Sequence, residues 1–316
     1  MPDRAGRRLL WLLGAALLAA AAFMLVAPKG SWGFLIPFRA ERLAALATVG
    51  ASVGLATVLF QTVAGNRILT PSILGFDALY QLFQTALVVL LGGIGFAALD
   101  PRGKFLVETA AMAGFAVVLL GLLMGRGRHD LHRLLLVGVI LGTFLRSLTA
   151  FLQRLLDPNA FSVVQGASFA SFSRVNAELL AIAAVLAAGA AALAWRWRHA
   201  LDVVSLGRPA AIGLGLDHDG MCRRALMLVA VLVSVSTALV GPVAFFGLLV
   251  ASLAHLVLRS PHHAHLLPAA ALIGATILIA GQTLFERVLG MQATLSVVIE
   301  FAGGLLFLIL LLRGPR

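Results

Sequence analysis

The sequence predicts an all-α integral membrane protein with about ten transmembrane helices. Hydrophobic residues make up 61% of its 316 positions and charged residues only 12%, about half the charged share of a soluble domain. Apolar runs long enough to cross a bilayer recur along the chain, and short segments with Gly, Pro and Arg separate them. We expect one transmembrane domain over residues 1–316.

Five spans are expected in the first half. N-terminal arginines precede the apolar run Leu9 to Ala27, which fits a retained span better than a cleaved secretory signal because further spans follow. Pro28 to Phe38 contains Trp32 and two prolines and is expected to be an interfacial loop. The second span is Glu41 to Ala64. The segment Gly65 to Tyr80 is a turn that leads into the third span, which ends near Leu91. The fourth and fifth spans are Phe105 to Met124 and Leu134 to Leu156.

Five more spans are expected in the second half. The polar loop Asp157 to Asn176 comes first, and within it Gln165 to Phe169 is expected to begin a short re-entrant or surface helix. Gly241-Pro242 ends the seventh span, and a short eighth span is expected directly after it because proline suits a helix start. The five spans are Glu178 to Trp195, Arg224 to Val240, Val243 to Leu258, Leu266 to Phe285, and Leu295 to Leu312.

The distribution of basic residues predicts the orientation. Ten spans with an internal N-terminus place both termini in the cytoplasm. Of the 24 lysines and arginines, 15 then fall on the cytoplasmic side and 8 on the outer side. Basic residues beside spans favour the cytoplasmic side, so this count favours the orientation.

One mixed segment, residues 201–219, is expected to form a cytoplasmic platform. Its apolar residues lie between polar residues and glycines, a pattern typical of short amphipathic helices, which Gly207-Arg208-Pro209 would break. Arginines flank the segment on both sides. The apolar positions are Leu201, Val204, Leu206, Ile212, Leu214 and Leu216. Such a platform suits a cytoplasmic partner; the alternative is a solvated loop between two helices.

The sequence lacks the motifs of several other classes. Gly103-Lys104 has no upstream glycine of a phosphate-binding loop, so the chain is not expected to hydrolyse ATP. No nucleophile–base or paired-carboxylate pattern points to an enzyme, and no cofactor is expected. The net charge of +11 is spread over the loops, which argues against nucleic-acid binding. A single cysteine, Cys222, excludes an intramolecular disulfide framework.

Two groups of polar residues each allow two interpretations. His262, His263 and His265 form a cluster in a short loop, but such histidines more often form a solvated edge, so no metal site is expected. Arg146 and Glu300 lie inside spans, where a charge costs about 2.5–3.5 kcal/mol. They fit either a transport pathway or an ion pair in the membrane or at a subunit interface.

Three stretches, in order, resemble the iron-chelate branch of ABC importer permeases, which also includes vitamin B12 permeases. Arg39 to Tyr80 is similar to the region of the family's second and third helices, and within it Asn66 to Asp77 is similar to a ferric-siderophore subgroup. Leu201 to Leu216 resembles the family's cytoplasmic coupling loop. Gly241 to Val250 resembles the hallmark that follows the seventh helix.

The resemblance implies a permease subunit that imports an iron(III)–siderophore complex across the bacterial cytoplasmic (inner) membrane. Its partners would be a second homologous permease, in a heterodimer rather than a homodimer, two ATP-binding subunits, and a periplasmic or lipid-anchored substrate-binding protein. Two motifs of the family are replaced in this chain. Ala251-Ser252 stand in place of the Pro-His pair that follows the hallmark, and Gln292-Ala293-Thr294 stand in place of the Glu-Leu-Pro motif before the last helix. These departures leave the chelate open.

The resemblance also implies roles for three groups of residues. Coupling to the ATPase is expected at Leu206, Gly207, Ala210, Leu214, Gly215 and Leu216. Docking of the binding protein is expected at Arg39, Arg42 and Arg287, and their alternative role is as interfacial anchors that snorkel to lipid phosphates. Translocation or close helix packing is expected at Gly75, Asp77, Gly241, Pro242 and Gly247.

Two alternatives to this function stay open. A stand-alone secondary transporter or channel would work without an ATPase and would use intramembrane acids such as Glu300. An importer of the same kind could carry another metal chelate, haem or cobalamin.

Overall fold

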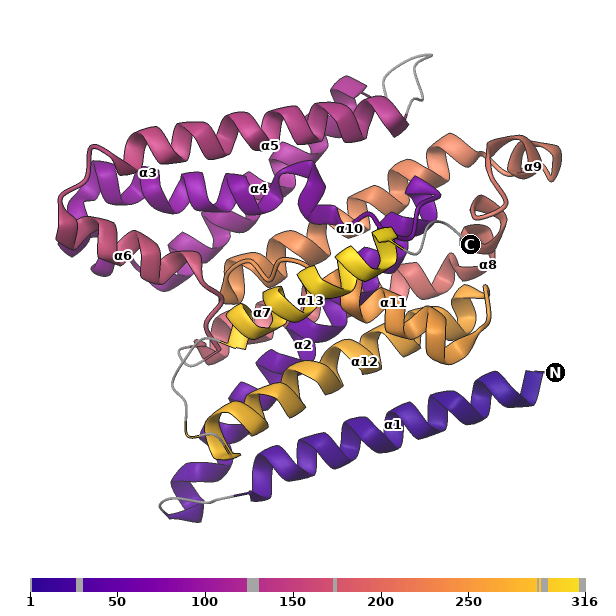
Figure 1. The fold of residues 1–316 in the computed structure, drawn as a ribbon, viewed down its shortest axis with the longest axis horizontal. Coiled ribbons are helices and arrows are strands. Elements are labelled where there is room, and N and C mark those ends of the chain that lie inside the picture. The colour runs from indigo at the N-terminus through magenta and orange to yellow at the C-terminus, as the bar shows by residue number, and fades with distance from the viewer. Residues whose placement is uncertain are drawn as a thin grey trace.

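The computed structural model describes residues 2–26, 31–123, 131–172, 175–288, 290 and 295–312, and this part of the chain is helical. It forms thirteen α-helices, a 3₁₀ turn and a π-helical turn. Figure 1 shows the long helices lying side by side in one bundle, with α3 to α6 on one flank and α1 on the other. The short helices α8 and α9 lie together at one end of the bundle.

The first half of the chain contributes six helices and the 3₁₀ turn. They are α1 (Pro2–Leu25), α2 (Trp32–Ala64), η1 (Pro71–Leu74), α3 (Phe76–Ala97), α4 (Pro101–Leu123), α5 (Leu131–Gln153) and α6 (Pro158–Ser168). The second half contributes α7 (Ala177–Arg196), α8 (Arg198–Val204), α9 (Arg208–Gly213), α10 (His218–Val240), α11 (Phe246–Leu258), α12 (His263–Thr283), the π turn η2 (Leu284–Val288) and α13 (Leu295–Leu312).

Ten of these helices follow the ten expected spans in order, and α6, α8 and α9 are the short additions. Within the described ranges, seven helices are long and apolar enough to cross a membrane by themselves: α1, α2, α3, α5, α7, α10 and α12. Helix α11 is apolar but shorter. The expected all-α membrane fold is therefore confirmed.

Several expected boundaries are wrong. Helix α3 ends at Ala97 rather than near Leu91, and α11 begins at Phe246 rather than at Val243. Three further differences lie in the expected loops and in the platform. The interfacial loop expected over Pro28 to Phe38 is helical from Trp32 onward, with Pro37 inside the second turn of α2; residues 28–30 lie outside the described residues. The short helix expected to begin at Gln165 begins earlier, and Gln165 lies in the last turn of α6, which ends at Ser168. The side chain of Asp157 accepts hydrogen bonds from Asn159 N and Ala160 N, and a proline follows this cap, so α6 begins at Pro158.

The third difference lies at the end of the platform segment. Helix α10 begins at His218, six residues before the expected Arg224. The Asp217 side chain caps it by accepting a 3.0 Å hydrogen bond from Gly220 N. An N-cap acid of this kind satisfies one of the free N–H groups of the first turn, which extends the helix into the polar segment.

The core is organised around α2 and α10. In the most hydrophobic 18-residue stretch of each of these helices, 67% is buried. Helix α2 packs closely along α12 because glycines face each other. A Cβ built on Gly50 would lie 2.5 Å from the carbonyl carbon of Gly274, and one on Gly54 would lie 2.6 Å from the carbonyl oxygen of Ala270. Small residues at such positions let membrane helices approach closely, so α2 and α12 form one tightly packed pair.

Candidate functional site

The first feature of the site is a break between α2 and α3. Helix α2 ends at Gly65, which has a left-handed backbone with φ 61°. The chain then forms η1 and turns again at Gly75, which has φ 90°. A Cβ at Gly75 would lie 3.1 Å from the Cα of Gly142 in α5. Glycine is therefore required at position 75 both for its backbone conformation and for the close contact with α5.

A second break separates α10 from α11. Gly241 follows α10 with φ 99°, and Val240 O accepts a 2.7 Å hydrogen bond from Ser171 N. Residues 241–245 are not helical and lead back into the bundle (Figure 1). The short helix α11 begins after them, at Phe246. Phe245 adopts a left-handed φ of 57° at this point. Non-helical backbone at membrane depth is tolerated where protein or a cavity surrounds it.

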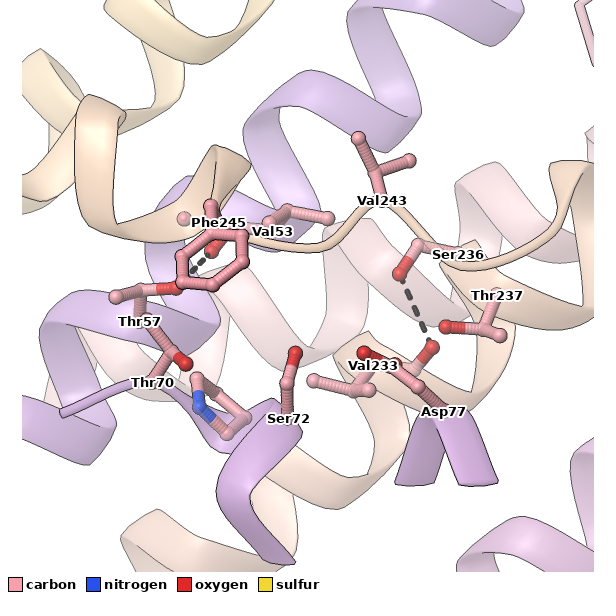
Figure 2. Close-up of a pocket in the computed structure, with 12 residues that line it drawn as sticks. Val53, Thr57, Thr70, Ser72, Asp77, Val233, Ser236, Thr237, Val243 and Phe245 are labelled. Carbon is pink, nitrogen blue, oxygen red and sulfur yellow. Dashed lines mark hydrogen bonds between the residues drawn. The ribbon is translucent and has the colours of Figure 1, made fainter. Parts of the chain in front are cut away.

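A polar cleft lies between these two breaks. Its cavity volume is about 30 Å³, enough for one or two water molecules. Figure 2 shows Ser72, Asp77 and Ser236 around this space, with Phe245 beside Thr57. The lining residues are Val53, Thr57, Thr70, Pro71, Ser72, Asp77, Val233, Ser236, Thr237, Val243, Phe245 and Gly247.

Of the residues predicted for translocation or packing, Asp77 and Gly247 line the cleft, while Gly75 and Gly241 form the turns of the two breaks. Pro242 follows Gly241 in the second break. Broken membrane helices around a midplane site are a recurring feature of transporters. The role of these residues in translocation stays a prediction. The hydroxyl residues of the cleft were not predicted, because serine and threonine are also ordinary helix residues in membrane spans.

Charged side chains gather beside the cleft. Asp77 at the start of α3 is hydrogen-bonded by Ser72 and lies within electrostatic reach of Arg146 on α5. Glu300 on α13 interacts with Asp77 in turn. The guanidinium of Arg146 folds back toward Gly142, where a built Cβ would lie 3.7 Å from Nη2. Asp77 therefore lies within electrostatic range of both intramembrane charges predicted from the sequence, and it attracts Arg146 and repels Glu300.

Three polar side chains are exposed on the otherwise apolar outer side of α5. Thr143, Arg146 and Ser147 are all exposed on the isolated chain, and their spacing places them on one side of the helix. Arg146 lies seven residues before the end of α5 at Gln153, roughly 10 Å along the axis. An arginine facing lipid at that depth is costly. We call these three residues the polar face of α5; exposed apolar side chains, Val139, Ile140 and Phe144, lie beside them on the same helix.

The predicted docking arginines come together at the end of the bundle opposite α8 and α9. Arg39 is 1% exposed and donates hydrogen bonds to the carbonyl oxygens of Phe23, Met24 and Val26. The Arg287 guanidinium lies 5.9 Å from the ring centroid of Phe23. In this chain these arginines therefore contact the end of α1 and its neighbours.

Arg42 has an intramolecular partner that was not predicted. Its guanidinium forms an ion pair with Glu286 in η2, with a second contact of 3.2 Å between Nη1 and Oε2. Its Nε donates a 3.2 Å hydrogen bond to Phe172 O. Because Arg42 is 8% exposed, this ion pair accounts for its position. Docking by the three arginines stays a prediction.

The platform has the two short helices that the sequence predicts, separated at Gly207, which has φ 89° and ψ 163°. Its outer surface is apolar, with Leu206, Ile212 and Leu214 exposed by 62%, 51% and 65%. Of the other predicted coupling residues, Ala210 and Gly215 are exposed and Leu216 is half-buried. Ile212 was part of the predicted apolar pattern but not of the predicted coupling residues.

An ion pair fixes the platform to α10. Arg208 contacts Asp219 through two hydrogen bonds of 3.3 and 3.1 Å. The Asp219 carboxylate raises the pKa of the Arg208 guanidinium above its ordinary value. Bidentate pairing of this kind holds a defined geometry, so α9 has a fixed orientation on the end of the bundle.

Broken membrane helices around a polar cleft, together with a structured apolar platform at one end, define a membrane transport protein. Residues 9–313 match the model of the FecCD transport family, and the chain belongs to that family. It is 40% identical over 306 residues to the petrobactin import system permease protein YclO of Bacillus subtilis, a match that covers 96% of both chains. It is 34% identical to the corresponding FatC protein of Bacillus anthracis, over 90% of this chain and 81% of the relative.

A solved structure has the same fold. The inward-facing conformation of a metal-chelate type ABC transporter superposes with a TM-score of 0.84 at 20% identity, covering 98% of this chain and all of the other. The resemblance to the siderophore and B12 branch of ABC permeases is thus confirmed. The chain is a multi-pass inner-membrane transport subunit rather than an enzyme.

Proposed function

We propose that this chain is the permease subunit of an ABC importer that moves an iron(III)–siderophore complex across the bacterial inner membrane. The observation that carries the proposal is the 40% identity to a petrobactin import permease over 96% of both chains. Ferric petrobactin is therefore the first substrate to test. The whole chain, residues 1–316, acts as one permease domain in this proposal.

The platform is the docking site for the ATP-binding subunit. Three exposed aliphatic side chains, Leu206, Ile212 and Leu214, would otherwise stand in water at the end of a membrane protein, and exposed apolar patches usually mark interaction sites. Gly207, Ala210, Gly215 and Leu216 shape this surface. The N-terminal end of α1 lies at the same end of the bundle (Figure 1), which supports cytoplasmic termini. ATP-driven closure of the ATPase would move the platform and switch the pathway.

A second, homologous permease completes the pathway. The polar face of α5, with Arg146 exposed at membrane depth, supports a partner or an aqueous path on that side. A heterodimer fits better than a homodimer because the resembled ferric-siderophore subgroup uses two different permeases. At the opposite end of the bundle, the substrate-binding protein docks near Arg39, Arg42 and Arg287 and delivers the chelate.

Reconstitution tests the proposal. The chain is placed in liposomes together with its partner permease, the ATP-binding subunit and the binding protein, and uptake of radioactive iron as ferric petrobactin is measured with and without ATP. A matched complex carries an ATP-binding subunit without its phosphate-loop lysine. ATP-dependent uptake that this matched complex lacks is the expected result.

The other outcomes separate the alternatives. Uptake by the chain alone, driven by an ion gradient, would identify a secondary transporter. ATP-driven uptake of a ferric hydroxamate, haem or cobalamin, without uptake of ferric petrobactin, would keep the importer and change its substrate.

A further inference from the structure

A partly buried series of hydrogen bonds connects the platform to the tightly packed helices α2 and α12. Asp202 in α8 accepts two hydrogen bonds of 2.7 Å at Oδ1, from the backbone N and from Nδ1 of His263 at the start of α12. The other ring nitrogen, Nε2, lies 2.7 Å from Thr62 Oγ1 near the end of α2. The His263 side chain is only 2% exposed. We call Asp202, His263 and Thr62 the platform link.

The first connection is a helix cap supplied by another helix. The residue before α12, His262, makes no side-chain capping hydrogen bond. Asp202 satisfies the first N–H of α12 in its place, and its negative charge lies where the helix dipole favours it. Its second oxygen lies 3.6 Å from His262 Nδ1. Because these hydrogen bonds involve a carboxylate, they are among the stronger ones in proteins.

The second connection can form in either protonation state of the imidazole. A carboxylate only accepts, so Nδ1 of His263 carries a hydrogen. The single hydroxyl hydrogen of Thr62 has two acceptors within reach, Nε2 at 2.7 Å and Val58 O at 2.9 Å. If it goes to Nε2, the ring is neutral; if it goes to Val58 O, Nε2 donates and the ring is protonated. The hydrogen bond between His263 and Thr62 therefore forms whether the ring is neutral or protonated.

The far side of the link leads to the cleft. The close contact between Gly50 and Gly274 holds α2 and α12 together as one tightly packed pair. Thr57, which lines the cleft and touches Gly247 in α11, lies five residues before Thr62 on the same helix. This separation is roughly 7.5 Å along the axis. A displacement of α8 is therefore passed to two helices at once, and one of them forms a wall of the cleft.

We propose that the platform link transmits the movement of the coupling helices to the α2–α12 pair, with His263 as its positioning residue. The inference rests on the proposed function, because it assigns a route to the ATP-driven movement. Coupling needs a physical element whose arrangement both sites influence. In the described part of the chain, the link joins α8 directly to α12 and, through His263, to α2. The interpretation of the histidine cluster as a solvated edge is wrong for His263, which is buried and hydrogen-bonded.

The test compares variants that cut single connections in the reconstituted complex. Thr62→Val removes the contact with His263, and His263→Asn keeps a donor near Asp202 but no longer reaches Thr62. Both should raise the ATP hydrolysed per chelate imported about tenfold, the effect expected when one buried hydrogen bond fails. His263→Gln, whose amide extends toward Thr62, should recover part of the coupling.

Two controls match these changes. Thr276→Val removes a threonine that makes the same bond to its own helix, from Thr276 Oγ1 to Leu272 O at 2.7 Å, without any role in the link. His199→Gln changes an exposed histidine on α8. Neither control should alter the ratio of ATP to chelate. The melting temperature of every variant is measured alongside it.

The outcomes distinguish a role in coupling from a role in stability alone. If Thr62→Val and His263→Asn lower the melting temperature but leave the ratio of ATP to chelate at the wild-type value, the three residues only brace the fold and the inference is overturned. An unchanged ratio with unchanged stability overturns it as well. A wild-type complex without ATP-driven uptake would instead refute the proposed function, and this inference with it.

Discussion

Gly247 at the start of α11 lies so close to Thr57 in α2 that a Cβ at position 247 would fall 2.0 Å from Thr57 Oγ1 and 3.1 Å from Thr57 Cβ. Thr57 is not free to turn away, because its hydroxyl donates a 2.8 Å hydrogen bond to Val53 O and its branched side chain has few rotamers. Both residues line the cleft. The absence of a side chain at 247 therefore sets the distance between the second helix break and α2.

Gly247→Ala should force α11 away from α2 and change the cleft. Overpacking of this kind costs about 1–3 kcal/mol, so we expect a lower melting temperature and reduced chelate uptake. Adding Thr57→Ala removes the clashing atoms and should restore both. The control Gly189→Ala, at a glycine with open space around it, should be neutral. Failure of Thr57→Ala to rescue Gly247→Ala would show that this contact does not determine the effect.

The platform glycines should matter through their backbone alone. Gly207 and Gly215 have φ of 89° and 81°, and a Cβ at either position would meet no atom within 4 Å. Valine there has to leave a conformation that costs it about 1–3 kcal/mol. We expect Gly207→Val and Gly215→Val to insert normally and to lose about tenfold of the ATPase stimulation by the loaded binding protein. Gly213→Val, in open space without a positive φ, is the control.

The outcome that would contradict the platform prediction is wild-type stimulation and uptake in both valine variants. A loss in Gly213→Val equal to theirs would also contradict it, because bulk rather than backbone conformation would then be responsible.

Replacing Arg146 by an apolar residue should not impair membrane insertion of the isolated chain. Removing a charge at membrane depth removes a cost of a few kcal/mol, so Arg146→Leu is expected to insert at least as well as the wild type. Uptake by the assembled complex should fall about tenfold, and Arg146→Lys should keep part of it. Arg154→Leu, beyond the end of α5, is the control. Unchanged uptake in Arg146→Leu would leave the polar face of α5 without a role.

The sequence predicts the helices of this fold well because their signals are local. Apolar length and the positions of glycine, proline and arginine locate the ten helices that follow the expected spans, and Gly207 separates α8 from α9 as expected. Capping also acts locally, but Asp157 and Asp217 were not recognised as N-caps, and the starts of α6 and α10 were misplaced for that reason.

The side-chain partners were not predictable, because they join residues far apart in the sequence. Arg42 and Glu286 are 244 positions apart, and Asp202 and His263 are 61 apart. No periodicity in one chain specifies which acid meets which base across a bundle. The cleft has the same origin, since its walls come from α2, η1, α3, α10 and α11. Asp77 and Gly247 were predicted only because they lie in motifs of a known family.

The ion pair between Arg42 and Glu286 should be a stability determinant of the end of the bundle opposite α8 and α9. Removing one partner of a buried pair leaves an uncompensated charge, at a cost of about 3–5 kcal/mol; the 23% exposure of the Glu286 side chain places the expected loss at the low end of that range or below it. Arg42→Ala should therefore lower the melting temperature, and the exchange Arg42→Glu with Glu286→Arg should restore most of it. An exchange variant as unstable as Arg42→Ala would contradict this account.

Docking of the substrate-binding protein is tested by charge reversal at the same end of the molecule. Arg39→Glu combined with Arg42→Glu should slow association with the reconstituted permease pair, most clearly at low salt, because charge complementarity acts mainly on encounter. Since both side chains are buried here and Arg42 pairs with Glu286, this double variant also threatens the fold. Arg287→Glu, at the least buried of the three arginines, provides a second probe, and the exchange variant of the ion pair controls for stability. If Arg287→Glu and a folded double variant keep the wild-type association rate and salt dependence, these arginines hold α1 and η2 in place and the binding protein docks elsewhere.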